Sequence, residues 1–186
     1  MAENPDVTVL LARASGGDRA AQDVLAPLVY AELKGRADAL MRRERDAQSI
    51  QATVLVNDAY MRLLGGAAVD FASRTHFFAI ASNVMRRVLV EHARARNRQK
   101  RGGGVEKVEF DEARMLSIDS DDDVLALEDA LTRLAEVDAR QADIVTMRFF
   151  GGMSMADVAD SLGISKRSCE REWSLIKAWL RRELAP

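Results

Sequence analysis

Residues 154–180 contain the pattern that most limits how this chain can fold. A short run with helical spacing follows Ser154 and ends at Gly163, and a longer run follows Ser165. Serine is a preferred helix N-cap, and glycine allows the positive φ angle of a tight turn. Along the longer run, apolar or sulfur-containing residues recur at i, i+4, i+7 and i+11: Cys169, Trp173, Ile176 and Leu180. The pattern predicts two helices joined by a tight turn, with the second buried along that stripe.

The second of these helices carries a polar face outside its apolar stripe. That face comprises Lys166, Arg167, Ser168, Glu170, Arg171 and Ser174. Such side chains bind phosphates and base edges when a helix-turn-helix inserts its second helix into the major groove. Cys169 belongs to the buried stripe, which favours a core residue over a nucleophile or a metal ligand. The pattern therefore predicts a DNA-reading helix-turn-helix, and a helical hairpin that does not bind DNA is the alternative.

Composition and glycine positions predict the rest of the architecture. Ala, Leu, Arg, Glu and Asp dominate and only three residues are proline, which favours helices over strands. A glycine run is followed by an acidic stretch without a sustained helical period. The chain is therefore predicted to be all-α, with a helical domain at 1–100, a flexible acidic linker at 101–124 and a second helical domain at 125–186. Gly151 and Gly152 are expected to end a helix within the second domain.

Charge is distributed unevenly, although the formal net charge is only −2. Residues 86–101 contain seven Lys or Arg and one acid, residues 106–129 contain ten acids, and residues 166–182 contain six basic and two acidic residues. A single basic patch is most simply a solvated helix face. Two such patches, in separate helical modules, favour two surfaces that bind an anion, and DNA is the anion that best fits them.

The first basic patch overlaps a predicted helix at 75–94, capped by Thr75. One arc of this helix is apolar: Phe77, Ile80, Ala81, Val84, Met85 and Val88. The opposite arc is expected to face solvent: His76, Ser82, Asn83, Arg86, Arg87, Val90 and Arg94. Its arginines suit phosphates and its asparagine suits a base edge. Just upstream, Phe71 is the candidate for a ring that stacks on an unpaired base, whereas Phe77 is expected in the core.

Several classes of protein are disfavoured by what the sequence lacks. It contains no glycine-rich phosphate-binding motif, and its two histidines, His76 and His92, have no acids or cysteines at metal-ligand spacing. It has no apolar run long enough for a membrane span and no leader pattern, and its single cysteine forms no internal disulfide. We therefore expect a cytoplasmic protein that is not an enzyme and holds no metal or cofactor.

The order of these elements resembles the extracytoplasmic-function sigma factors, the smallest class of bacterial transcription initiation factors. Residues 51–64 are similar to the family's polymerase-binding helix, residues 71–101 to its melting and −10 segment, and residues 153–180 to its −35 reader. The resemblance implies a four-helix region 2, an acidic linker and a region 4 helix-turn-helix. It also implies core RNA polymerase (the clamp of the largest subunit, and the flap) and promoter DNA as partners.

The resemblance assigns roles to particular residues. It implies contacts with the −10 element by Phe71, His76, Asn83, Arg86, Arg87 and Arg94. It implies contacts with the −35 element by Lys166, Arg167, Ser168, Glu170, Arg171 and Ser174. Glu170 departs from commoner relatives, which have a lysine near that position, so their promoter motifs do not transfer to this chain.

The polymerase-binding helix also departs from the family pattern. Its predicted contact residues are Gln51, Thr53, Val54, Asn57, Asp58 and Met61. Most relatives carry acids at the positions of Gln51, Thr53 and Val54, and this chain keeps only Asp58. Phosphorylation of Thr53 by a serine/threonine kinase would restore negative charge there. Alternatively, Thr53 bonds to its own helix backbone, and Val54 and Met61 make a purely apolar polymerase contact. The sequence leaves both interpretations open.

Two other functions fit parts of the sequence. A stand-alone helix-turn-helix regulator would bind duplex operator DNA without polymerase, but it leaves the first basic helix and the long acidic linker unexplained. A helical adaptor that binds only proteins is disfavoured by the two basic faces. Gel shifts with and without core polymerase distinguish all three.

Overall fold

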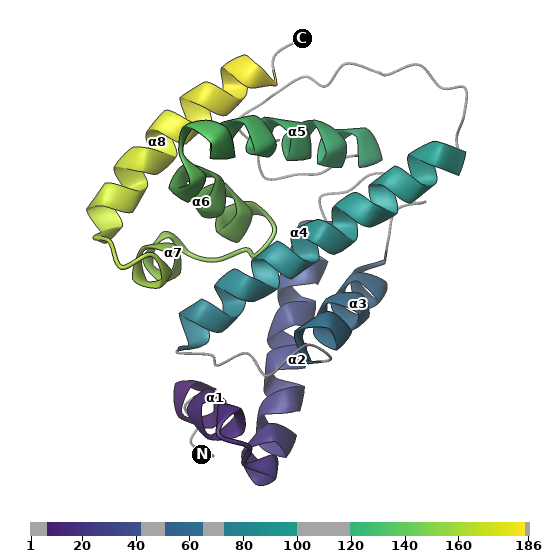
Figure 1. Ribbon diagram of the computed structural model, residues 1–186, viewed down its shortest axis with the longest axis vertical. Coiled ribbons are helices and arrows are strands. Elements are labelled where there is room, and N and C mark those ends of the chain that lie inside the picture. The colour runs from purple at the N-terminus through teal and green to yellow at the C-terminus, as the bar shows by residue number, and fades with distance from the viewer. Residues whose placement is uncertain (1–6, 42–50, 65–72, 100–119, 185–186) are drawn as a thin grey trace.

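The computed structural model describes residues 7–41, 51–64, 73–99 and 120–184, which form eight α-helices and no strand (Figure 1). The all-α prediction is confirmed. The helices are α1 (Val7–Ser15), α2 (Arg19–Met41), α3 (Ala52–Leu64), α4 (Arg74–Gln99), α5 (Asp121–Val137), α6 (Ala139–Phe149), α7 (Met155–Ser161) and α8 (Lys166–Glu183).

Helix α4 is the central element of the molecule. It crosses the middle of Figure 1, with α1, α2 and α3 below it and α5, α6 and α7 above it. It packs directly against α3 on one side and against α5, α6 and α7 on the other. Helix α8 lies at the outer edge, where it packs on α6 and α7. The first four helices and the last four helices are hereafter the N-terminal and C-terminal modules.

The C-terminal module begins earlier than the sequence indicates. Ser120 is the N-cap of α5, where its hydroxyl accepts a hydrogen bond from the Asp123 amide. The first turn of α5 contains three aspartates, and their negative charges interact favourably with the positive end of the helix dipole. The predicted linker boundary at 124 is therefore wrong, because residues 121–124 are helical. The rest of the predicted linker, up to residue 119, lies outside the described residues.

Helix α4 also departs from its prediction, at its cap and in its burial. It begins at Arg74, and the hydroxyl of Ser73, rather than that of Thr75, accepts a hydrogen bond from the His76 amide. Ser82 and Val90, predicted to face solvent, are 0% and 4% exposed. The physical reason is that α5, α6 and α7 cover a second side of α4. A single apolar arc in the sequence indicates only one buried side.

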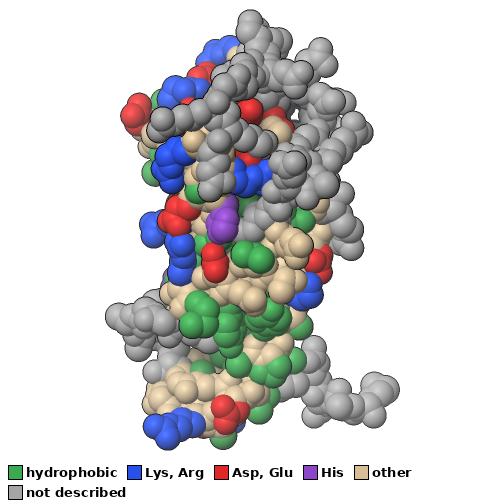
Figure 2. Space-filling view, turned by 90° about the vertical axis from the view of Figure 1, so that its right-hand side faces the viewer, with side chains coloured by type: hydrophobic (Ala, Val, Ile, Leu, Met, Phe, Trp, Pro, Cys, Tyr) green, Lys and Arg blue, Asp and Glu red, His purple; other side chains and the backbone are tan. Residues whose placement is uncertain are grey.

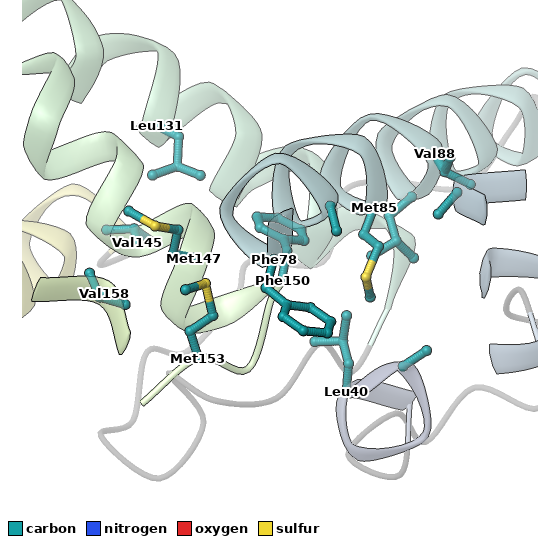
Figure 3. Close-up of a cluster of buried hydrophobic side chains, with 14 of the residues drawn as sticks. Leu40, Phe78, Met85, Val88, Leu131, Val145, Met147, Phe150, Met153 and Val158 are labelled. Carbon is teal, nitrogen blue, oxygen red and sulfur yellow. The ribbon is translucent and has the colours of Figure 1, made fainter. Parts of the chain in front are cut away.

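One hydrophobic core runs through both modules. In Figure 3, Phe150 extends from the end of α6 towards Leu40 of α2 and Phe78 of α4. Phe150 and Met153 are both 0% exposed. Because these side chains belong to the C-terminal module and lie against the N-terminal one, burying them holds the two modules together.

Candidate nucleic-acid interface

The helix-turn-helix has the capping and turn geometry that its sequence predicts. Ser154 and Asp157 form a capping box at the start of α7, and Ser165 caps α8 by accepting a hydrogen bond from the Ser168 amide at 3.1 Å. Gly163 has φ 64°, in the region that favours glycine. These predictions are confirmed. The two caps fix where α7 and α8 begin, and Gly163 fixes the turn between them. Together they determine the angle between the two helices.

The apolar stripe of α8 seats this helix on its module. Cys169, Ile176 and Leu180 are at most 1% exposed, whereas Trp173 is only half-buried, with the Arg148 guanidinium 5.8 Å from its ring centre. Burial raises the pKa of the Cys169 thiol, which keeps the sulfur protonated and poorly nucleophilic. Cys169 is therefore a core residue, as its spacing predicts.

The seat also includes an ion pair that the sequence reading missed. Glu172 is 9% exposed, and its carboxylate lies 3.0 Å from Nη2 of Arg140 on α6. The only indication in the sequence is its position next to Trp173, in the apolar stripe of α8. The pair links α8 to α6 on the side of α8 opposite its solvent-exposed face.

The outward face of α8 carries most of the predicted −35 residues. Lys166, Arg167, Glu170, Arg171 and Ser174 are exposed. Lys166 forms an exposed ion pair with Glu170 at 3.6 Å. Ser168 is half-buried, and its hydroxyl lies 2.8 Å from that of Ser165, so it completes the cap. Within the described part of the chain, no acidic side chain pairs with Arg167 or Arg171. Two guanidiniums are thus left for an external anion.

The predicted −10 residues divide into two groups on α4. Asn83, Arg87 and Arg94 are exposed, whereas His76 is half-buried. The exposed three line a hollow of about 300 Å³, whose other walls are Arg86, Val90, Glu91 and Glu128. Phe71 lies outside the described residues.

Arg86 lies deeper than its sequence position indicates. Its Nε donates to Glu128 of α5 at 2.7 Å, and its Nη1 donates to the Thr146 hydroxyl of α6 at 3.2 Å. The expectation that Arg86 faces solvent with Arg87 is therefore wrong for this arrangement. The reason is the same as for Ser82 and Val90: the C-terminal module packs over this side of α4.

The hollow has acidic walls as well as basic ones. Glu91 forms a hydrogen-bonded ion pair with Arg62 of α3, and this bond lowers the pKa of the Glu91 carboxyl. Glu128 is the partner of Arg86. The face combines an amide and arginines with two carboxylates, so in this state it is less attractive to phosphates than its arginines alone suggest.

The predicted polymerase-binding residues lie on helix α3, apart from Gln51, which directly precedes it. Its buried side comprises Leu55, Val56, Ala59 and Leu63. On the other side Val54 is 41% and Met61 68% exposed, and Gln51, Thr53 and Asn57 are also exposed. The face of the molecule in Figure 2, which is the side that carries α3 in Figure 1, shows hydrophobic side chains gathered near its centre.

Three of the predicted contact residues have polar partners on neighbouring helices. In the first pair the Tyr30 hydroxyl of α2 donates to the side-chain oxygen of Asn57 at 2.8 Å. Asp58 is half-buried, and its carboxylate lies 3.3 Å from Nε2 of His92 on α4. The Thr53 hydroxyl accepts a hydrogen bond from Lys34 of α2 at 3.4 Å. The first turn of α3 contains no acid, as its sequence shows.

The structure brings together three residues that sequence reasoning did not single out as a site. Arg36 of α2 donates to the carbonyl of Gly151 at 2.6 Å, and a Cβ on Gly151 would lie 1.8 Å from the Ser82 hydroxyl. The glycine pair after α6 was recognised only as a helix stop. Its second role, close approach to α4, depends on tertiary contacts that local spacing does not encode.

The fold and these surfaces define a class: an all-α DNA-binding protein with a helix-turn-helix and a second basic helix. The family model for ECF sigma factors matches residues 4–186, and the chain belongs to this family. No curated protein and no solved structure matches the chain. It is thus an alternative sigma factor that directs transcription, a transcription regulator rather than an enzyme, with core RNA polymerase and promoter DNA as its partners.

A membrane-spanning helix and a metal-binding cluster are both absent from the described residues. None of their helices is long and apolar enough to cross a membrane. In the same residues, no cluster of three or more His, Cys, Asp or Glu side chains is arranged to hold a metal ion.

Proposed function

We propose that the three surfaces divide promoter-specific initiation among them. In this proposal α8 reads the −35 element, the exposed side of α4 reads the −10 element, and the outward face of α3 binds the polymerase. The corresponding domains are residues 1–100 and a C-terminal domain that begins with α5 at Asp121, joined by the acidic segment between them. The protein acts in the cytoplasm, where the polymerase works.

The observation that carries this proposal is that Arg167 and Arg171, on a capped and firmly packed helix, have no acidic partner among the described residues. Bidentate arginine contacts with guanine are the commonest specific contacts in the major groove. Because α8 is held by its buried stripe and by Glu172, the backbone that carries the outward side chains needs little ordering when it meets DNA. The second candidate, a stand-alone regulator, is favoured only by the exposure of this helix.

Run-off transcription and gel shifts with the promoter of the protein's own operon test the proposal. A sigma factor directs a run-off product with core polymerase and binds the promoter tightly only in its presence. A stand-alone regulator shifts the same duplex without polymerase. A tight shift by the free chain, together with no run-off product, would replace the first function by the second.

For −35 reading we predict that Arg171→Ala weakens promoter use by about 1–3 kcal/mol at one base position, because a bidentate contact with a base is lost. The measurement is run-off transcription over promoters that vary one −35 base pair at a time. Arg182→Ala, the same change on the last turn of α8, is the matched control and is expected to leave base preference unchanged. Equal loss on every promoter would make Arg171 a phosphate contact instead.

For the −10 element we predict that Asn83→Ala impairs open-complex formation and leaves polymerase binding intact. Asn83 is exposed, and its amide nitrogen has only a local contact of 3.3 Å with the Ala79 carbonyl, so it is available for a base edge. Permanganate reactivity of the melted strand measures the open complex, and co-purification with core polymerase is the control. Wild-type reactivity in the variant would contradict the assignment.

The proposal extends to regulation at Thr53. A phosphate on this exposed hydroxyl would lie near the positive end of α3 and within reach of Lys34. It would add about −1.5 to −2 charges to a helix face without acids in its first turn. A serine/threonine kinase is then a partner, and no anti-sigma factor is required.

The alternative is that Val54 and Met61 bind polymerase through apolar contact alone. The exposure of Val54 and Met61 is compatible with both interpretations, apolar contact alone and phosphorylation of Thr53. Within the described hydrogen bonds, the Thr53 hydroxyl is bonded to Lys34 rather than to its own helix backbone. Removing the hydroxyl while keeping the apolar face distinguishes the two, as described in the Discussion.

A further inference from the structure

Leu175 is a large apolar residue on the otherwise polar outward face of α8. Its side chain is 61% exposed, whereas the next residue, Ile176, is 0% exposed. Large exposed hydrophobic side chains are few in the described part of the chain, and Leu175 alone among them lies on α8: Val9, Val24, Val54, Met61, Val137 and Leu175. The sequence reading assigned only polar residues to this face and left Leu175 without a role.

Helical spacing places Leu175 in line with the two arginines of the face. It follows Arg171 by four residues and Arg167 by eight, and all three side chains are exposed. Residues four apart lie on the same side of a helix, one turn after another. These three residues, Arg167, Arg171 and Leu175, are hereafter the reading strip. Helix α8 itself lies at the outer edge of the molecule (Figure 1).

The rotation of α8 about its axis is fixed at the level of Leu175. Ile176 fills the core beside it, and Glu172, one turn before Ile176, pairs with Arg140 of α6 at 3.0 Å. A second ion pair, of 2.6 Å, joins the last turn of α8 to α5. The direction in which Leu175 projects is therefore set before DNA binds. Ordering a leucine also costs less rotamer entropy than ordering a lysine or an arginine.

A leucine at this place has a specific chemical partner in the major groove. Its side chain neither donates nor accepts a hydrogen bond, so it cannot read the donor and acceptor pattern of a base edge. Thymine, however, displays its C5-methyl group in the major groove, where apolar side chains contact it. The arginines of the reading strip suit guanine instead. The strip thus combines two chemistries that distinguish different base pairs.

Helix geometry places this partner close to the base that Arg171 contacts. From Arg171 to Leu175 the helix advances about 6 Å. Successive base pairs are about 3.4 Å apart. Side chains one helical turn apart on the reading strip therefore reach bases that are one or two pairs apart.

We propose that Leu175 reads the methyl group of a thymine in the −35 element, one or two base pairs from the base that Arg171 contacts. This inference rests on the proposed −35 role of α8 and adds a specificity-determining residue to it. A single exposed leucine is common on protein surfaces and indicates nothing by itself. Its place in line with two arginines that have no acidic partner among the described residues is what assigns it to DNA.

Deoxyuridine tests the proposal, because it differs from thymidine only by the missing C5-methyl group. Promoters with a thymine at each −35 position in turn, on either strand, are prepared a second time with deoxyuridine at that position. Run-off transcription with core polymerase and the full-length chain then gives the ratio of the thymine rate to the uracil rate. We expect a ratio of roughly four at one position, the factor that corresponds to burying one methyl-sized group, and equal rates at the others.

Three variants assign this difference to one side chain. Leu175→Ala should abolish it, so that the thymine and uracil promoters are used equally at that position. Leu175→Met keeps a long apolar side chain and should retain the difference. Val137→Ala shortens an exposed apolar side chain on α5 of the same module, and this matched control should keep the wild-type ratio. A variant that only folds less well lowers both rates together and leaves the ratio unchanged.

The outcomes separate this inference from the proposed function. Equal use of thymine and uracil at every position by the wild-type chain would overturn methyl reading alone, since a run-off product is still formed. A ratio that Leu175→Ala leaves unchanged would overturn it too, and a loss of both rates in that variant would make the leucine a polymerase contact instead. If the wild-type chain directs no run-off product from any promoter, the proposed function fails and this inference with it.

Discussion

Ile176→Ala is expected to lower the free energy of unfolding by about 2–5 kcal/mol, because it removes a fully buried side chain and leaves a cavity. Ile176 lies in the middle of the stripe that seats α8 on the rest of its module. The neighbouring Leu175 is 61% exposed and supplies a matched control of equal size. Leu175→Ala is expected to change stability by no more than about 0.5 kcal/mol.

Urea denaturation followed by circular dichroism measures both variants. The same pair separates stability from promoter reading, since loss of the seat should weaken use of all promoters together. If the two alanine variants were equally stable, the burial of the stripe that positions the proposed −35 face would be wrong.

Thr53→Val is expected to reduce transcription of a target promoter in cells at least roughly tenfold under the proposed phosphate switch. A phosphate can make one to three charge-assisted hydrogen bonds with a basic clamp, and valine can make none. Valine keeps the size and branching of threonine and makes the face of α3 more apolar. Thr53→Ser, which retains a phosphate acceptor, is expected to keep activity.

The same set of variants decides between the two interpretations of α3. If polymerase binding depends only on the apolar contact of Val54 and Met61, Thr53→Val keeps or raises activity, and that result would contradict the switch. Thr53→Ala is expected to follow Thr53→Val. Failure of Thr53→Glu alone is compatible with the switch, since one carboxylate has less charge and fewer acceptor oxygens than a phosphate.

The helix-turn-helix was predictable because its determinants are local. Ser154, Ser165 and Gly163 each act within one turn of helix, and the stripe ending at Leu180 repeats at helical spacing. The start of α5 was also encoded locally, since Ser120 followed by three aspartates is a favourable helix start. The acidity of the surrounding stretch outweighed that indication and led to the linker assignment.

The surroundings of α4 were not predictable from spacing. Its burial on a second side depends on a module that lies far along the chain. That module covers Ser82, Val90 and Arg86, which helical spacing alone places in solvent. Hydrophobic periodicity reports one buried face of a helix and does not identify a second partner. Close approach through Gly151 is likewise visible only when both partners are in place.

The docking of the modules has a consequence for how promoters compete. If only a fraction of the free chains exposes α4, the apparent affinity for every promoter falls by that same fraction. A uniform factor changes the amount of protein needed for initiation but preserves the ranking of strong and weak promoters. Loosening the contact between Ser82 and Gly151 is therefore expected to act like a change in gene dosage, whereas under the proposed −35 role a change at Arg171 is expected to alter which promoters are chosen.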